Sequence, residues 1–275
     1  MADALRPYLA VVSARYRMLL QYRAAAFAGF VTQLFWGVIK LMVFAAFYAL
    51  AADGQPMSFA QVVAYVWLGQ ALLGLLPWNV DPELSEKMLT GAVAYELLRP
   101  VDLYALWYAR TIAMRTATTT LRCIPMVVVT GFVLPFLGLE AWALRPPPDA
   151  AAAVAFAVSL AATVLLASSV TMVLHVALFW TISGRGFNTI MTGLVIGLSG
   201  MVIPLPLFPS WLQPFLEWQP FRGLADVPFR IYTGHIAPAA AVGDIAFQLV
   251  WAAAFVIAGR SVLTLATRRL VVQGG

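Results

Sequence analysis

The sequence predicts an all-α membrane protein with six transmembrane helices, an N-terminal interfacial amphipathic helix and a re-entrant outer loop between spans five and six. Of its 275 residues, 62% are hydrophobic and only 11% are charged. A typical soluble domain is about 45–50% apolar and about 25% charged, so this chain has too few charges to cover a surface in water. The composition excludes disorder, a collagen-like fibre and an ordinary cytosolic enzyme.

The first 23 residues predict an amphipathic helix that lies in the cytoplasmic interface. Its apolar residues follow the i, i+3, i+4, i+7 spacing of one helix face, and Arg6, Ser13, Arg17 and Gln21 fall on the other. Arginines interrupt this stretch, so no cleavable signal peptide is expected. We therefore divide the chain into this helix (1–23) and one transmembrane domain (24–275).

Six stretches are apolar enough to cross a bilayer, which takes about 20 mostly apolar residues in a helix. They span 24–50, 58–78, 123–139, 150–180, 187–204 and 244–266. The third continues a long helix that begins in the cytoplasm and enters the bilayer between about Thr116 and Arg122. Residues 204–238 are rich in Pro and Trp but carry charges, and they predict an extracytoplasmic region of short interfacial or re-entrant helices.

The basic residues predict the orientation of these spans. With the N terminus inside, eleven Lys and Arg fall in cytoplasmic segments and three in outer loops. By the positive-inside rule, both termini are cytoplasmic. The net charge of +5 suits nucleic acid or membrane lipid, and its placement at the ends of spans favours lipid, so no nucleic-acid partner is expected.

Most catalytic motifs are absent from the sequence. It contains no phosphate-binding G-x-x-x-x-G-K-[ST] loop and no H-E-x-x-H, and its single cysteine and two distant histidines make a metal site unexpected. No cofactor is therefore expected on this chain. All acidic residues can be placed in loops or at the ends of spans, which counts against an ion-coupled secondary carrier.

One motif has a catalytic interpretation. Gly197-Leu198-Ser199-Gly200 is similar to the nucleophile motif of rhomboid intramembrane proteases, which need a histidine within hydrogen-bond reach of the serine. His235 and His175 are the two candidates. The alternative is that small residues let helices approach closely, and for His175 we expect a hydrogen-bonded packing role.

Lys40 is the most unusual residue of the first span, because a charged lysine at mid-bilayer costs about 2.5–3.5 kcal/mol on insertion scales. It either lines a translocation path or holds an acidic partner at a subunit interface, or its long side chain reaches the membrane surface.

The cytoplasmic segment 81–102 predicts a short polar helix. Asp81 suits the N-cap, Pro82 the first helical position, and Glu83 the positive end of the helix dipole, while Gly91 suits the stop. A connection of this length with its own helix is long for a tight bundle, and such loops are often functional.

These residues carry a family resemblance. The string Tyr95-Glu96-Leu97-Leu98-Arg99-Pro100-Val101-Asp102 after Gly91 resembles the cytoplasmic signature of the type-two ABC exporter permeases. Gln21-Tyr22-Arg23 and Trp107-Tyr108-Ala109-Arg110 are similar to the same bacterial branch, in which two unlike six-span permeases are served by a separate ATPase.

The resemblance implies a membrane permease subunit that exports an amphipathic or hydrophobic substrate such as a drug, a toxic cation or a lipid. It implies ABC ATPase subunits and a second permease, identical or homologous, as partners in the bacterial inner membrane. ATP and Mg would bind on the ATPase, not on this chain. The residues that would couple to the ATPase are Pro82, Glu83, Glu86, Lys87, Glu96, Arg99 and Asp102.

The polar and aromatic residues of spans one, two and five are candidates for the substrate path. They are Gln33, Trp36, Lys40, Trp67, Gln70 and Asn188. Two other functions stay open on the sequence alone: a self-contained intramembrane serine protease built on Ser199, and an ion-driven secondary carrier or channel.

Overall fold

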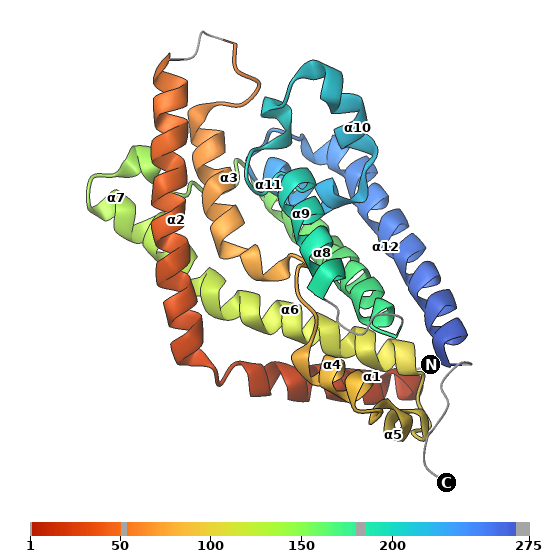
Figure 1. The fold of residues 1–275 in the computed structure, drawn as a ribbon. Helices are drawn as coiled ribbons and strands as arrows, with labels where there is room; N and C mark the ends of the chain where they lie inside the picture. The colour runs from red at the N-terminus through yellow and green to blue at the C-terminus, as the bar shows by residue number, and fades with distance from the viewer. Residues whose placement is uncertain (1, 51–53, 180–184, 268–275) are drawn as a thin grey trace.

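The computed structural model describes residues 2–50, 54–179 and 185–267, and all regular elements within those ranges are helical (Figure 1). Four helices there are long and apolar enough to cross a membrane. They are α2 (Arg23–Leu50), the continuous segment Leu103–Phe136 (which begins with α6, Leu103–Val128), α8 (Ala150–Ala177) and α12 (Pro238–Thr267). The prediction of an all-α, multi-pass membrane protein is confirmed, and these four helices coincide with predicted spans one, three, four and six.

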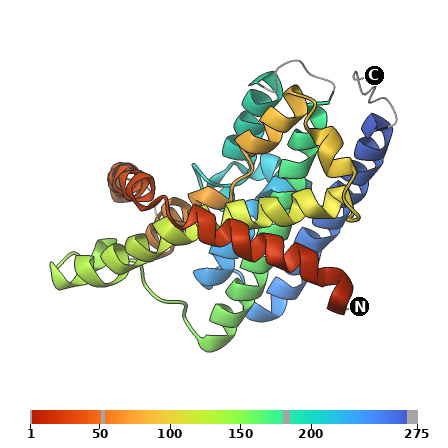
Figure 2. The ribbon, with the colours of Figure 1, turned by 90° about the horizontal axis from the view of Figure 1, so that it is seen from below.

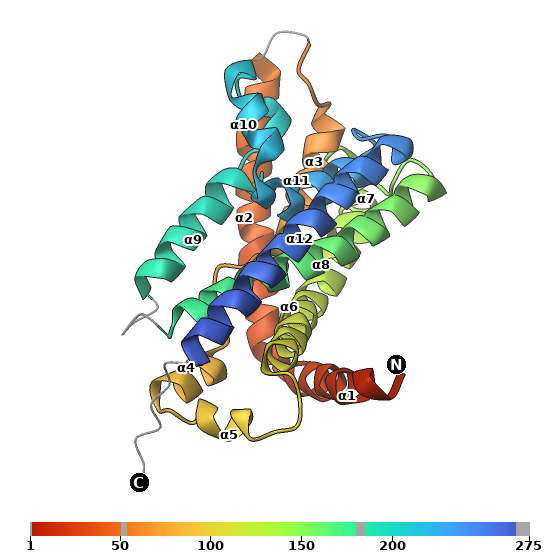
Figure 3. The ribbon, with the colours of Figure 1, turned by 90° about the vertical axis from the view of Figure 1, so that its right-hand side faces the viewer.

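Helices α8 and α12 pack side by side (Figures 1 and 3). A buried polar cluster fixes how they face each other. Gln248 of α12 accepts a hydrogen bond from Ser159 Oγ at 2.9 Å and donates to Thr163 Oγ1 at 3.0 Å. It also donates to the Gly223 carbonyl at 2.7 Å. Because a polar group without a partner is costly in lipid, such bonds select one alignment of the two helices.

The predicted second span contains a shorter helix than expected. Helix α3 (Phe59–Ala71) has 13 residues, about 20 Å at 1.5 Å per residue, and a 3₁₀ turn, η1 (Leu73–Leu75), follows. Beyond it the guanidinium of buried Arg115 donates to the Leu76 carbonyl at 2.7 Å and to the Asn79 carbonyl at 2.6 Å. Arg115 therefore supplies donors to two backbone carbonyls of this non-helical segment.

The predicted fifth span is also broken. Helix α9 (Arg185–Leu198) has 14 residues, and neighbouring groups then bind the freed carbonyls. Gln219 Nε2 donates to the Leu198 carbonyl at 2.9 Å, and the Asp226 amide donates to the Ser199 carbonyl at 3.0 Å. Gly200 turns the chain with φ +83°, and a Cβ there would lie 2.3 Å from the Tyr65 hydroxyl, so only glycine fits.

Residues 204–238 form short helices, as predicted. They are η4 (Leu205–Leu207), η5 (Ser210–Leu212), α10 (Gln213–Trp218), η6 (Pro220–Leu224) and α11 (Asp226–Tyr232). Helix α11 is largely buried against α3 and α8. Its Asp226 accepts hydrogen bonds from the Tyr65 hydroxyl at 3.0 Å and the Leu205 amide at 3.2 Å, and pairs with Arg230 at 3.1 Å. This carboxylate therefore ties the region to α3.

The opposite end of the molecule carries three further helices: α1 (Ala2–Leu19), α4 (Pro82–Leu89) and α5 (Val93–Leu97) (Figure 1). Helix α1 forms as predicted and lies across α6 (Figure 2), where the Tyr16 hydroxyl bonds Thr120 Oγ1 at 3.0 Å. The C-terminal end of α12 lies at this same end of the molecule. Arg268 and Arg269, which the orientation prediction counts as cytoplasmic, lie outside the described residues.

Candidate functional site

Helix α4 begins and ends where its sequence indicates. The Asp81 side chain accepts the Glu83 amide at 3.0 Å as N-cap, Pro82 occupies the first turn, and Gly91 takes a φ of +74° beyond the helix end. A second short helix, α5, follows directly. The pair protrudes from the end of the molecule that carries α1 (Figure 1).

A network of six charged side chains holds α4 and α5 against α1 and α6. We call it the clamp network, and its members are Arg15, Asp81, Glu83, Lys87, Glu96 and Arg110. Arg15 of α1 pairs with Asp81 at 3.0 Å and also with Glu83. Lys87 pairs with Glu83 at 3.0 Å and with Glu96 at 2.8 Å. Arg110 of α6 pairs with Glu83 at 2.9 Å and with Glu96 at 3.5 Å. Three carboxylates thus face three cations.

The environment of the network keeps Glu83, Glu96 and Lys87 charged. Burial alone raises the pKa of Glu83, but hydrogen bonds from Lys87, Arg110 and Arg15 outweigh it and lower the pKa from 4.5 to about 2. For Glu96, burial is again opposed by hydrogen bonds from Lys87 and from the Trp107 indole at 2.6 Å, and the net effect lowers its pKa. The same contacts outweigh burial at Lys87 and raise its pKa. All three groups are therefore ionised at neutral pH.

His175 connects the network to α8. Its Nε2 accepts a hydrogen bond from the Asp81 amide at 2.8 Å, and the side chain is fully buried. The bond joins the C-terminal end of α8 to Asp81, the N-cap of α4. His175 is thus a hydrogen-bonded packing residue, as the sequence suggests.

The predicted ATPase-coupling residues fall into three sets. Glu83, Lys87 and Glu96 belong to the clamp network, while Asp102 caps α6 through the Ala105 amide at 2.7 Å and pairs with Arg260 at 3.1 Å. The others, Pro82, Glu86 and Arg99, are exposed. Near them Tyr95 and Leu98 are 76% and 81% exposed. We call the surface of Glu86, Tyr95, Leu98 and Arg99 the docking face.

Sequence reasoning missed three members of this site: Arg15, Trp107 and Arg110. Residues three apart on a helix share one face, so the spacing of Trp107 and Arg110 was a usable signal. Nothing in the sequence indicates Arg15, whose partner Glu83 lies 68 positions away.

A cavity of about 610 Å³ lies between α2, α3, α6 and the end of α9. We call it the Lys40 cavity. Its lining residues are Gly29, Thr32, Gln33, Trp36, Lys40, Gln70, Leu73, Trp78, Arg122, Ile196, Met201 and Val202. Lys40 Nζ donates to the Met201 carbonyl at 3.1 Å, and the Arg122 side chain lies against Gly29.

The comparison with known families decides between the functions left open by the sequence. Residues 34–274 match the family model of the ABC-2 family transporter protein. The chain belongs to the ABC-2 transporter family. No curated protein matches it significantly. Membership identifies the chain as the membrane subunit of an ABC transporter, which works with an ABC ATPase.

In this ABC-2 permease, four of the six residues predicted for the substrate path line the Lys40 cavity: Gln33, Trp36, Lys40 and Gln70. The other two lie elsewhere. Trp67 is fully buried, donates its indole N–H to the Trp142 carbonyl at 2.7 Å and packs its ring against Gly37. Asn188 is half-buried on α9 and does not line the cavity.

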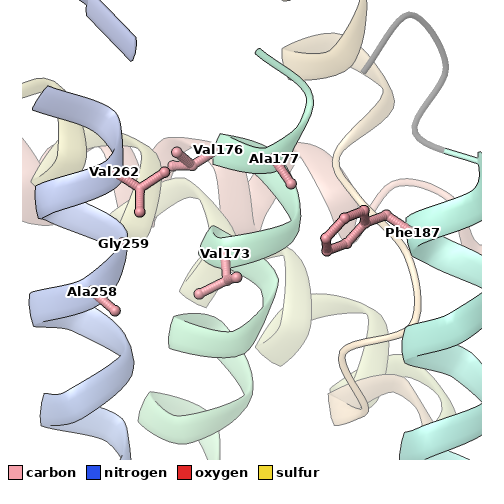
Figure 4. Close-up of a pocket in the computed structure, with 7 residues that line it drawn as sticks. All are labelled: Val173, Val176, Ala177, Phe187, Ala258, Gly259 and Val262. Atoms are coloured by element: carbon pink, nitrogen blue, oxygen red, sulfur yellow. The ribbon is translucent and has the colours of Figure 1, made fainter. Parts of the chain in front are cut away.

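A second cavity of the permease, about 290 Å³, lies between the C-terminal parts of α8 and α12 and the start of α9 (Figure 4). Its walls are apolar: Phe187 reaches from α9 toward Val173 of α8, and Ala258 and Val262 line it from α12. This cavity offers no side chain that could recognise a polar ligand, so we do not assign it a site.

The structure gives the protease interpretation of the permease no support. Ser199 is buried, and its Oγ accepts the Met201 amide at 3.2 Å. Across the described residues neither histidine hydrogen-bonds Ser199, and His175 bonds Asp81 at the other end of the fold. Gly197 lies in the last turn of α9, and Gly200 turns the chain after it.

Proposed function

We propose that this permease is the membrane-spanning subunit of an ATP-driven exporter that moves an amphipathic or hydrophobic substrate out of the cytoplasm. The observation that carries the proposal is the α4–α5 pair. Ion pairs hold it against α1 and α6, and the large side chains of Tyr95 and Leu98 are exposed on it, as are Glu86 and Arg99. Exposed aromatic and aliphatic residues with a charged rim are typical of a protein interface.

The contacts of this pair suit the transmission of force from an ATPase. Arg15 of α1, Arg110 of α6 and His175 of α8 each make a direct bond to the α4 segment. A displacement of the docking face by the ATPase would therefore be transmitted to all three helices. In this scheme Pro82, Glu83, Glu86, Lys87, Glu96, Arg99 and Asp102 couple ATP turnover to the membrane helices. Of these seven, Pro82, Glu86 and Arg99 contact the ATPase, Glu83, Lys87 and Glu96 hold the pair in place, and Asp102 joins the start of α6 to Arg260 of α12.

We further infer six crossings with both termini in the cytoplasm of a bacterial cell. Helices α3 and α9, with the internally bonded segments that follow them, make the second and fifth crossings. Support comes from the arrangement of α1, α4, α5 and the end of α12 at one end of the molecule (Figure 1), and from the excess of basic residues in the segments assigned to the cytoplasm. A second permease, identical or homologous, completes the transporter.

Co-purification tests the proposal. The chain is tagged, expressed with its neighbouring genes, extracted in mild detergent and analysed for bound proteins. We expect a stoichiometric ATP-binding protein. Leu98→Ser on the docking face should abolish its capture, whereas Trp211→Ser, at a residue 76% exposed in the distant 204–238 region, should not. A permease that purifies alone, or equal capture by both variants, would contradict the proposal.

A further inference from the structure

The charges of the Lys40 cavity are all of one sign. Lys40 and Arg122 line it, and none of the lining residues is acidic. We propose that this cavity binds the anionic head group of an amphipathic substrate. The inference rests on the proposed function, because it names the class of molecule that the exporter moves.

The two cations lie at different depths of the cavity. Arg122 lies beside Gly29, where a Cβ would come within 2.8 Å of its Nε. Lys40 follows eleven residues later on α2, which at 1.5 Å per residue places the two levels about 16 Å apart. An anionic group can therefore meet a first cation near the cytoplasmic end of α2 and a second one deeper in the bilayer.

Both cations have donors left for a ligand. Arg122 makes no ion pair with any residue in the described ranges, and its Nε is buried without a hydrogen-bond partner there. Lys40 uses one N–H on the Met201 carbonyl, and an ammonium has three. Since buried charges are normally paired, these two groups lack the negative partner that a bound anion supplies.

The Lys40 cavity is also lined by a buried side-chain amide, that of Gln33. Gln33 is 5% exposed, and its Oε1 has no hydrogen-bond partner in the described chain. Buried polar atoms without a partner are rare in folded proteins and call for a ligand, a water molecule or a strain-related reason. Gln33 lines the cavity between the levels of Gly29 and Lys40, so a polar head group there would reach it.

The remaining walls suit an apolar chain. Trp36, Trp78, Leu73, Ile196 and Val202 contribute most of the lining beside the polar groups. The volume of about 610 Å³ falls within the roughly 300–1,000 Å³ of small-molecule sites. Aromatic rings alone would also attract a cation, but two fixed positive charges without a carboxylate oppose it. The cavity therefore favours an anionic amphiphile over the toxic cation that the family resemblance suggests.

Equilibrium binding to the purified transporter complex in phosphatidylcholine nanodiscs tests the inference. The probes share one alkyl chain and differ in charge: dodecyl phosphate, dodecylphosphocholine and dodecyltrimethylammonium, with empty nanodiscs as the partition control. We expect dodecyl phosphate to bind at least ten-fold more tightly than the other two. At least one of Arg122→Gln and Lys40→Gln should weaken it about ten-fold, because the two cations lie too far apart for one phosphate to contact both. The matching Arg122→Lys or Lys40→Arg variant should retain most of the affinity.

Arg17→Gln serves as the matched control, because Arg17 is an exposed arginine of α1 that bonds Ser13 and lies outside the cavity. Its affinity for dodecyl phosphate should stay within two-fold of the parent. Equal binding of the cationic probe, unchanged affinity in both glutamine variants, or equally tight binding of inorganic phosphate alone would overturn the inference. Competition by phosphatidylglycerol added to the nanodisc would identify a lipid as the source of the head group, and its absence a single-chain anion.

This result is separable from that of the proposed function. The ATP-binding partner is scored in the same preparations by co-purification. A complex that retains the ATPase but shows no preference for dodecyl phosphate would refute the anionic substrate and leave the permease assignment standing.

Discussion

Replacing Glu96 by glutamine removes one charge from the centre of the clamp network with almost no change in volume. The Glu96 side chain is 4% exposed and receives hydrogen bonds from Lys87 at 2.8 Å and from the Trp107 indole at 2.6 Å, with Arg110 at 3.5 Å. A neutral amide can still accept one of these bonds. It has no negative charge to offset the positive charges of Lys87 and Arg110, so these two cations repel each other more strongly.

The size of the effect follows from these contacts. Breaking a buried ion pair costs about 3–5 kcal/mol. Lys87 is 28% exposed and Arg110 11%, and both keep Glu83 as a second partner, so we expect the lower end of that range or slightly less, about 2–3 kcal/mol. For a chain of this length that corresponds to a fall in melting temperature of roughly 3–5 °C.

The assay pairs this variant with Glu86→Gln, the same chemical change at an exposed position of the neighbouring helix α4. Melting temperature in detergent and ATPase co-purification are measured for both. Glu96→Gln should lower the melting temperature and reduce ATPase capture, because the α4–α5 pair loosens. Glu86→Gln should leave the melting temperature unchanged and weaken ATPase binding alone.

A Glu96→Gln chain that melts with the parent and captures the ATPase fully would refute the clamp. So would a Glu86→Gln chain that is destabilised as much as Glu96→Gln, because the internal and outward faces of the pair would then not be separate.

Two further predictions follow from other contacts. Arg115→Gln should destabilise the chain by about 3 kcal/mol or more, because the carbonyls of Leu76 and Asn79 lose their donors. Arg115→Lys should recover only part of this stability, since an ammonium lacks the planar, forked geometry of a guanidinium. Thermal unfolding of the parent and the two variants measures both effects. The pKa of Glu83 is about 2 in the fold, below its ordinary 4.5, so its stabilising effect is complete above pH 4.5 and is lost as the pH falls toward 2. Melting temperatures at pH 6 and pH 3 should differ less in Glu83→Gln than in the parent, and an unchanged difference would count against this role.

The elements that were predicted correctly depend on local signals. Helix α1, the four long spans and the cap of α4 follow from apolar periodicity, span length and the Asp81-Pro82-Glu83 sequence. These signals lie within one element, and no distant partner is needed to interpret them.

The breaks in the second and fifth spans depend only in part on local signals. Residues 72–78 are as apolar as the helix before them, although Gly74 and Pro77 disfavour a continuous helix. What the sequence cannot show is the partner of the freed carbonyls, Arg115, which donates from 36 or more positions away. The clamp network also depends on contacts between distant parts of the chain. Arg15 and Arg110 pair with carboxylates only because the fold brings α1 and α6 next to α4.

The cavity shows the same limit at single residues. Trp36 and Trp67 are both tryptophans within apolar spans, and the sequence offers both for a substrate path. Trp36 lines the cavity and is 53% exposed, whereas Trp67 is buried against Gly37. Which face of a helix meets a cavity depends on its neighbours, so composition cannot separate the two.

The bond between Arg15 and the α4 carboxylates has a practical consequence for the design of shortened proteins. Because helix α1 precedes the first membrane span, it is an obvious segment to remove when the protein is shortened. Deleting it would remove one of the three cations of the network and leave Asp81 and Glu83 to share Arg110 and Lys87. A truncated chain of this kind would carry an excess negative charge beneath the docking face, so its failure to bind an ATPase would report on the missing arginine as much as on the missing helix.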